Sequence, residues 1–222
     1  QIRAGDRRDY SDAQVIVITA GAKQAPGESR LNLLQKNAAI IEEIVDEIVA
    51  QKSQAVLLIA SNPVDILTQV ALKRSGWTKN RVIGSGTVLD SARFRYLISQ
   101  HCKVDVGNVH AYILGEHGDS EVAAWSMTHV AGVTMDSYCP QCGNCRDWHG
   151  ERDRIVREVK DSAYHIINYK GSTYFGIAMS LARIVGTILQ DQNSVLTVST
   201  YLEGEYGLHD VCLSIPCVVG QG

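Results

Sequence analysis

The chain has 222 residues, of which 45% are hydrophobic, so it can bury a substantial core as one large domain or two small ones. Its 21 basic and 24 acidic residues give a formal charge of -3 and are scattered along the sequence, which excludes the basic stripe of a nucleic-acid-binding protein. No apolar run approaches the roughly 20 residues that span a bilayer, and no signal-peptide pattern is present, so we expect a cytoplasmic protein with neither nucleic-acid nor membrane partners.

The first part of the sequence predicts alternating strands and helices. Residues 13–20 and 55–60 are short apolar runs rich in branched side chains, typical of strands buried on both faces. Residues 30–51 carry apolar side chains at helical spacing, a second helix is expected over 64–74, and a third strand over 82–84. This order indicates βαβ units and therefore a parallel sheet.

Ligands of such sheets bind at the carboxyl ends of the strands. Gly21, Asn62 and Ser85 follow the three predicted strands and would lie at this edge. The sequence therefore predicts a small-molecule site there, although an asparagine before a proline is also typical of a simple turn.

After Gly86 the pattern changes to a mixture of helices and short strands. We expect a helix over 89–100, a strand over 109–114, two helical stretches separated at Gly171, and a closing hairpin from strands 195–201 and 211–219. The predicted fold class is α/β, with a partial Rossmann-type parallel sheet over residues 1–84 and a mixed α+β domain over 85–222.

The strongest chemical signal comes from the run GEHGDS at residues 115–120, preceded by DSAR at 90–93. The imidazole of His117 titrates near neutral pH, and a carboxylate such as Asp90 on its second ring nitrogen would fix its tautomer. The guanidinium of Arg93 matches a substrate carboxylate in bidentate geometry. Taken alone, each element is more typical of a turn histidine or a charged first helical turn.

Five motifs together resemble bacterial NAD-dependent L-lactate dehydrogenases, of the lactate/malate dehydrogenase family. They are ITAGA at 18–22, GESRL at 27–31, ASNPVD at 60–65, GSGTVLDSAR at 84–93 and GEHGD at 115–119. The resemblance covers essentially the whole chain. It implies reversible hydride transfer between NADH and pyruvate, giving L-lactate, in a cytoplasmic homotetramer of fermentative glycolysis.

The resemblance also implies roles for individual residues. The catalytic set would be His117 as proton donor and acceptor, Asp90 as its orienting partner, and Arg30, on a closing loop, polarising the substrate carbonyl. Arg93 would bind the substrate carboxylate and Asn62 its oxygen. The positions that would contact NAD are Gly21, Ala22, Asn37, Ala60, Ser61, Asn62 and Ser85.

Substrate choice would depend on Gln24 and Thr173, by the same resemblance. A neutral glutamine leaves a second substrate carboxylate unpaired, so Gln24 favours pyruvate over oxaloacetate, and a small threonine leaves room for a methyl group. A malate dehydrogenase is the alternative within the family.

Arg95 and His110 match positions that form a fructose 1,6-bisphosphate site between subunits in bacterial relatives. Two cationic donors can bind a sugar phosphate, so we expect this compound as an activator. The alternative is an ordinary surface arginine and a strand histidine.

The resemblance also predicts that the chain is a fragment. The family's first strand, its Gly-x-Gly-x-x-Gly turn and the acidic residue for the adenosine ribose would precede Gln1, and its last strand and helix would follow Gly222. We therefore expect this chain alone to bind NAD poorly, because the adenosine half of the cofactor would lose its support.

Six cysteines would suit a disulfide framework only in a short secreted chain, so reduced thiols are expected here. Cys139, Cys142 and Cys145 share one loop, with His149 nearby, and three thiolates and an imidazole can hold zinc. Because structural zinc sites usually join two separated ligand clusters, we expect no metal and interpret the segment as a surface loop. A catalytically silent protein that functions through this loop is the alternative from a different class.

Overall fold

The computed structural model describes residues 2–22, 27, 29–144, 147–171 and 173–221. The chain divides into two compact units, one made of Gln1–Gly86 with Arg183–Gly222 and the other of Thr87–Ala182. Among the described residues, no helix is both long and apolar enough to cross a membrane.

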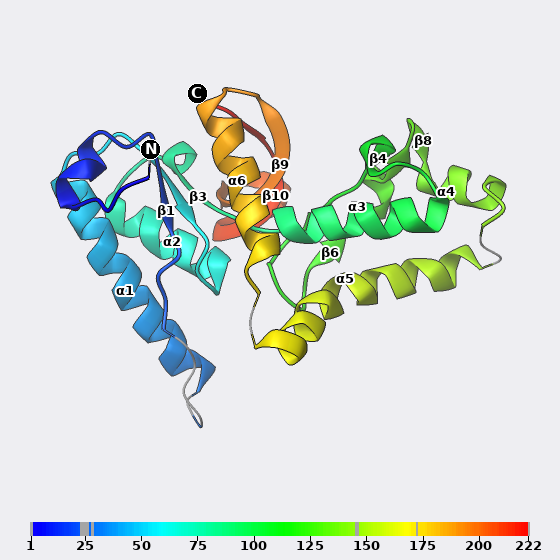
Figure 1. Ribbon diagram of the computed structural model, residues 1–222, viewed down its shortest axis with the longest axis horizontal. Coiled ribbons are helices and arrows are strands. Elements are labelled where there is room, and N and C mark those ends of the chain that lie inside the picture. Colours follow the sequence, from blue (N-terminus) through cyan, green and yellow to red (C-terminus); the bar gives the residue numbers. More distant parts are fainter. Residues whose placement is uncertain (1, 23–26, 28, 145–146, 172, 222) are drawn as a thin grey trace. The chain divides into compact units, whose positions relative to one another are not determined.

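The first unit is built on one sheet of strand order β1-β2-β3-β9-β10 (Figure 1). Its parallel part consists of β1 (Val15–Ile18), β2 (Val56–Ile59) and β3 (Val82–Gly84), close to the predicted ranges. The last two strands, β9 (Ser194–Glu203) and β10 (His209–Val219), run antiparallel to their neighbours. The prediction of a Rossmann-type parallel sheet is confirmed.

Two helices connect the parallel strands. In α1 (Arg30–Ala50), Ser29 caps the first turn by accepting a hydrogen bond from the Asn32 amide at 3.1 Å. The buried face of α1 carries Ile41, Val45 and Ile48, which join the core of the sheet. The second helix, α2 (Val64–Ser75), ends at Gly76, which adopts the left-handed conformation with φ of 64°. Glycine makes this tight helix end possible because it has no Cβ.

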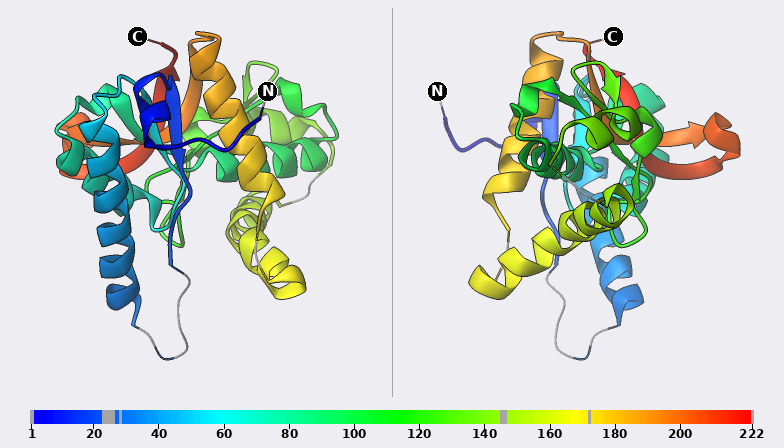
Figure 2. Two further views of the ribbon diagram at one scale, coloured as in Figure 1. Left: turned by 60° about the vertical axis from the view of Figure 1, so that its left-hand side comes forward. Right: turned by 90° about the vertical axis from the view of Figure 1, so that its right-hand side faces the viewer.

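The hairpin of β9 and β10, drawn in orange and red in Figure 2, joins the sheet of the first unit rather than the domain with which the sequence grouped it. The reason is the free edge of β3, whose backbone groups need partners. Gly84 of β3 pairs with Ser199 of β9. The backbone at Gly86 approaches β9 so closely that an added Cβ would lie 2.5 Å from the Ser199 nitrogen.

The second unit contains α3 (Val88–Cys102) and α5 (Trp148–Lys170), which pack against each other. Its core includes Phe94, Ile98 and Ile155. The predicted single strand over 109–114 is instead two short strands in different sheets. The remaining short elements are β4 (Val109–His110), β5 (Ile113–Leu114), β6 (Val122–Ala123), β7 (His129–Val130), β8 (Val133–Thr134) and α4 (Met135–Tyr138).

Helix α6 (Phe175–Leu189) follows α5 after the predicted break at Gly171, which has a positive φ of 80°. Single 3-10 turns complete the chain, at Arg7–Ser11, Lys79–Arg81, Val106–Asn108, Trp125–Met127, Cys139–Gln141 and Glu205–Gly207.

Candidate active site

The first turn of α3 is fastened to β5. Thr87 Oγ1 donates a hydrogen bond to the Ile113 carbonyl oxygen, and the Ile113 amide donates to Ser91 Oγ at 2.9 Å. These bonds lie in the buried interior, where they are not exchanged with water. Since β5 leads directly into the turn that carries His117, the fastening brings this turn to the start of α3.

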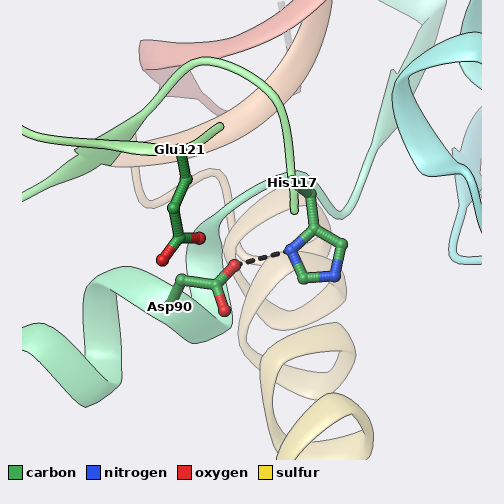
Figure 3. Close-up of side chains that lie close together, drawn as sticks. All are labelled: Asp90, His117 and Glu121. Carbon is green, nitrogen blue, oxygen red and sulfur yellow. Dashed lines mark hydrogen bonds and ion pairs between the residues drawn. The ribbon is translucent and has the colours of Figure 1, made fainter. Parts of the chain in front are cut away.

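His117 and Asp90 form the centre of the site (Figure 3). His117 Nδ1 lies 2.7 Å from Asp90 Oδ2, and the Asp90 side chain is 5% exposed whereas that of His117 is 29% exposed. An ionised carboxylate can only accept, so the hydrogen bond assigns the proton to Nδ1. This leaves Nε2 as the ring nitrogen with which a ligand would exchange a proton.

Arg93 lies one helical turn after Asp90. Its Nη1 is 3.4 Å from Asp90 Oδ1, and its side chain is 16% exposed. A guanidinium has five N–H donors in a planar fork, so this long contact leaves it able to bind a carboxylate bidentately. The three side chains predicted from the 90–93 and 115–120 segments are therefore neighbours in the second unit.

A fourth ionisable side chain, Glu121, was missed by the motif analysis. It is 6% exposed, and its Oε1 accepts no hydrogen bond from the part of the chain that the structure describes. Burial, and next the charge of Asp90, raise the pKa of Glu121 to about 7. The sequence pattern gives no signal for this burial, because Val122, the apolar neighbour of Glu121 at the start of β6, is exposed whereas the glutamate is buried.

In the first unit, Asn37 organises the carboxyl ends of the parallel strands. Its Oδ1 accepts a hydrogen bond from the Ala22 amide at 2.7 Å, and its Nδ2 donates to the Asn62 carbonyl oxygen at 3.2 Å. Ser61 Oγ donates to the Ala20 carbonyl oxygen, which joins the loops after β1 and β2. The other predicted cofactor positions of these strand ends are Gly21, Ala60 and Ser85.

This edge fits a dinucleotide. Glycine, alanine, serine and asparagine are small side chains that let a cofactor approach the backbone, and the carboxyl ends of parallel strands are where such cofactors bind. The backbone at Gly21 is uncrowded, because the nearest atom that an added Cβ would meet outside the adjoining residues is Asn37 Oδ1, at 3.6 Å.

The other predicted substrate-binding residues come from separate segments of the chain. Arg30 is exposed at the first residue of α1, and Thr173 is half-buried in the segment that connects α5 to α6. Asn62 is exposed and precedes a cis peptide bond to Pro63. Gln24 lies outside the described residues. The roles of these four residues remain predictions.

The two predicted effector residues lie near each other in the second unit. Arg95 donates a hydrogen bond from Nη1 to the Ala111 carbonyl oxygen at 3.2 Å. His110, which precedes Ala111 in the sequence, is exposed in β4. Effector binding by this pair remains a prediction.

The cysteine loop is only partly described. Cys139 is fully buried, with its Sγ 3.3 Å from His101 Nε2, and Cys142 Sγ donates to the Cys139 carbonyl oxygen at 3.1 Å. His149 is exposed, and Cys145 lies outside the described residues. Zinc binding by this loop remains the untested alternative.

Comparison with protein families identifies both halves of the chain. Residues 1–84 match the NAD binding domain of lactate/malate dehydrogenase, and residues 87–222 match its alpha/beta C-terminal domain. This chain belongs to the lactate/malate dehydrogenase family. It is an NAD-dependent oxidoreductase, with NAD as its cofactor.

Individual relatives are similar over nearly all of the chain. It is 58% identical to an L-lactate dehydrogenase of Treponema denticola over 221 residues, which is 99% of this chain and 70% of that protein. An L-lactate dehydrogenase of Acetivibrio thermocellus is 53% identical over 99% of this chain and 69% of that protein. The ligand-bound crystal structure of the minor L-lactate dehydrogenase from Enterococcus mundtii is 44% identical, with a TM-score of 0.93 over 98% of this chain and 68% of that one.

Proposed function

We propose that this member of the family is an L-lactate dehydrogenase, which reduces pyruvate to L-lactate with NADH and catalyses the reverse reaction. The observation that carries the proposal is the hydrogen bond of 2.7 Å between His117 Nδ1 and Asp90 Oδ2, with Arg93 one helical turn away. The relatives named above support the choice of substrate.

His117 would exchange the proton. In pyruvate reduction its Nε2 gives a proton to the carbonyl oxygen, and in lactate oxidation it takes the proton from the hydroxyl. Asp90 is almost fully buried, so its negative charge acts with little screening and stabilises the protonated imidazole. It also fixes the orientation of the ring through the hydrogen bond at Nδ1.

Arg93 would bind the substrate carboxylate, and Arg30 would stabilise the negative charge that develops on the carbonyl oxygen. These contacts fix the keto acid in one orientation, so that the reduced carbon has a single configuration. Arg30 is at the first residue of α1 and immediately follows the segment around Gly27 that the family resemblance implies is a closing loop.

NAD supplies the hydride chemistry when bound. Asn37, Ser61 and the backbone around Gly21 would hold its nicotinamide half, since their hydrogen bonds already fix the loops after β1 and β2. Ser85, at the end of β3, is the third contact expected at this edge.

The first test is NADH oxidation by the purified protein with pyruvate and, separately, oxaloacetate. We expect turnover with pyruvate and much weaker turnover with oxaloacetate. Gln24→Arg should raise the oxaloacetate-to-pyruvate ratio, because an arginine would pair with the second carboxylate. A preference for oxaloacetate in the unaltered protein would instead identify a malate dehydrogenase.

A second test concerns the substrate carboxylate. Arg93→Lys should lower kcat/KM for pyruvate by about 10- to 100-fold, because lysine cannot form the bidentate pair. The matched control is Arg157→Lys, since Arg157 is an exposed arginine on α5. Equal kcat/KM values for the two variants would contradict the role of Arg93.

The proposal extends to assembly and regulation. We expect a cytoplasmic homotetramer of fermentative glycolysis that fructose 1,6-bisphosphate activates through Arg95 and His110. The sedimentation velocity of the protein and its KM for pyruvate, each with and without the sugar bisphosphate, test these expectations. Arg95→Gln should abolish any activation while sparing turnover at saturating pyruvate.

A further inference from the structure

One buried carboxyl group beside His117 has no part in the proposed mechanism. Glu121 is 6% exposed, and Figure 3 shows its carboxyl group beside that of Asp90. One carboxylate oxygen of Asp90, one of Glu121 and a ring nitrogen of His117 all lie within 4.8 Å of one another. Glu121 Oε1 is buried and has no hydrogen-bond partner among the described residues. Such a group is unfavourable in a protein interior, so its position beside the histidine calls for an explanation.

The backbone holds Glu121 in the same turn as His117. The Glu121 amide donates a hydrogen bond to the Gly118 carbonyl oxygen at 3.1 Å, and the next residue, Val122, pairs with Leu114 across β5 and β6. These bonds fix the backbone of Glu121 close to the histidine.

The charges that act on Glu121 come from three elements. Asp90 and Arg93 belong to α3, His117 to the turn, and Lys160 to α5. Burial, followed by Asp90, raises the pKa of Glu121 to about 7, while His117, Lys160 and Arg93 oppose this change. Glu121 thus gains and loses its proton near neutral pH, in the same range as an imidazole.

We propose that Glu121 is a positioning residue for proton exchange at His117, and that its negative charge sets the pH range in which the imidazole stays protonated. The inference rests on the dehydrogenase function proposed above. When His117 passes its proton to a carbonyl oxygen, the pair with Asp90 changes from neutral to singly negative. A charged Glu121 opposes this change by repulsion and favours proton uptake during lactate oxidation, and a neutral Glu121 does the reverse.

The first experiment measures His117 directly and needs no activity. In protein labelled with ¹⁵N-histidine, the resonances of His117, assigned with His117→Asn, are followed against pH by NMR. Glu121→Gln removes the charge at nearly constant volume, so the pKa of His117 should fall by about one pH unit. The two-step titration expected of coupled groups should become a single step.

The matched control is Glu116→Gln, an exposed glutamate in the same turn that accepts a hydrogen bond from Ser120. It should leave the titration of His117 unchanged. Glu121→Met is the second variant, since it fills a similar volume without charge and serves if Glu121→Gln does not fold. An unchanged His117 titration in either folded variant would overturn the proposal.

The second experiment measures kcat/KM for pyruvate with NADH against pH. The fall on the alkaline side, where His117 loses its proton, should move to lower pH by about one unit in Glu121→Gln. Glu121→Asp should restore most of the wild-type profile, because it restores the charge. If the wild-type protein reduces no keto acid, the proposed function fails, but the NMR titration still decides whether Glu121 controls the proton of His117.

Discussion

Replacing Glu121 by glutamine should make the protein more stable at neutral and alkaline pH, by an amount that the position of the residue allows us to work out. Burial and the nearby charge of Asp90 raise the pKa of Glu121 from its ordinary value of 4.5 to about 7. This difference of about 2.5 pH units, at about 1.4 kcal/mol per unit, corresponds to about 3 kcal/mol. This free-energy cost applies to the ionised form of Glu121 in the folded protein.

The sign follows from proton binding. Between pH 4.5 and 7 the folded protein keeps the proton on Glu121 while the unfolded chain releases it. The stability linked to this proton is fully present below about pH 4.5 and is lost as the pH rises through about 7. Glutamine does not titrate, so from pH 5 to pH 8 the wild type should lose about 2–3 kcal/mol relative to Glu121→Gln.

The assay is urea unfolding of both proteins at pH 5, 6, 7 and 8, with the protein concentration held constant because subunit association also stabilises the folded state. Glutamine can also alter the packing, but this effect does not depend on pH. It therefore cancels when the stability difference between the two proteins at pH 5 is compared with the difference at pH 8. Glu116→Gln, at an exposed position in the same turn, should show no such trend. If the stability difference between wild type and Glu121→Gln is the same at pH 5 and pH 8, burial does not raise the pKa of Glu121.

Three further predictions concern the site, the sheet and the thiols. Asp90→Asn should lower kcat for pyruvate reduction by about 100-fold or more, because the protonated imidazole of His117 loses its anionic partner. Stopped-flow single turnovers with NADH would measure this rate, and an unchanged rate would contradict the role of Asp90. Gly86→Ala should destabilise the protein by about 2 kcal/mol or more, since its Cβ would lie 2.5 Å from the Ser199 nitrogen at a φ of 50°. Gly132→Ala, also at positive φ but with nothing within 4 Å, is the control for backbone strain alone in the same thermal unfolding assay. Burial raises the pKa of Cys212 to about 12, so iodoacetamide should label it only after unfolding, and mass spectrometry of the labelled peptides would detect any earlier reaction.

The parallel sheet could be predicted from sequence because its signals are local. Each strand is a short run of branched apolar residues, and each helix has regular apolar spacing and an identifiable end, such as Gly76. These patterns depend on the intrinsic periods of strand and helix, which tertiary contacts rarely reverse.

The pairing of distant segments could not be predicted in this way. The hairpin of β9 and β10 is recognisable from its own residues, but nothing in them indicates that it would complete the edge of β3. The choice depends on close packing at Gly86, which places the backbone against Ser199 and Thr197, more than a hundred residues away in the sequence. The same limitation applies to the predicted strand over 109–114, which splits between two sheets.

The burial of polar side chains also could not be predicted from local sequence. In α1 the apolar Leu31 is 62% exposed, whereas the polar Asn37 is 3% exposed. Asn37 is buried because its amide satisfies backbone groups of two separate loops, at Ala22 and Asn62. Hydrophobicity alone contains no information about such partners.

By itself, the sequence determined the family of the protein, the order of strands and helices in its parallel sheet, and the residue types available for proton exchange and carboxylate binding. These follow from local patterns and from motifs of neighbouring residues. Only the tertiary structure brought His117 within 2.7 Å of Asp90, and only it placed Glu121 beside them without a hydrogen-bond partner among the described residues. The physical reason is that desolvation and the interaction of charges depend on distances in space and on the exclusion of water, which arise when α3, β5, β6 and α5 pack together.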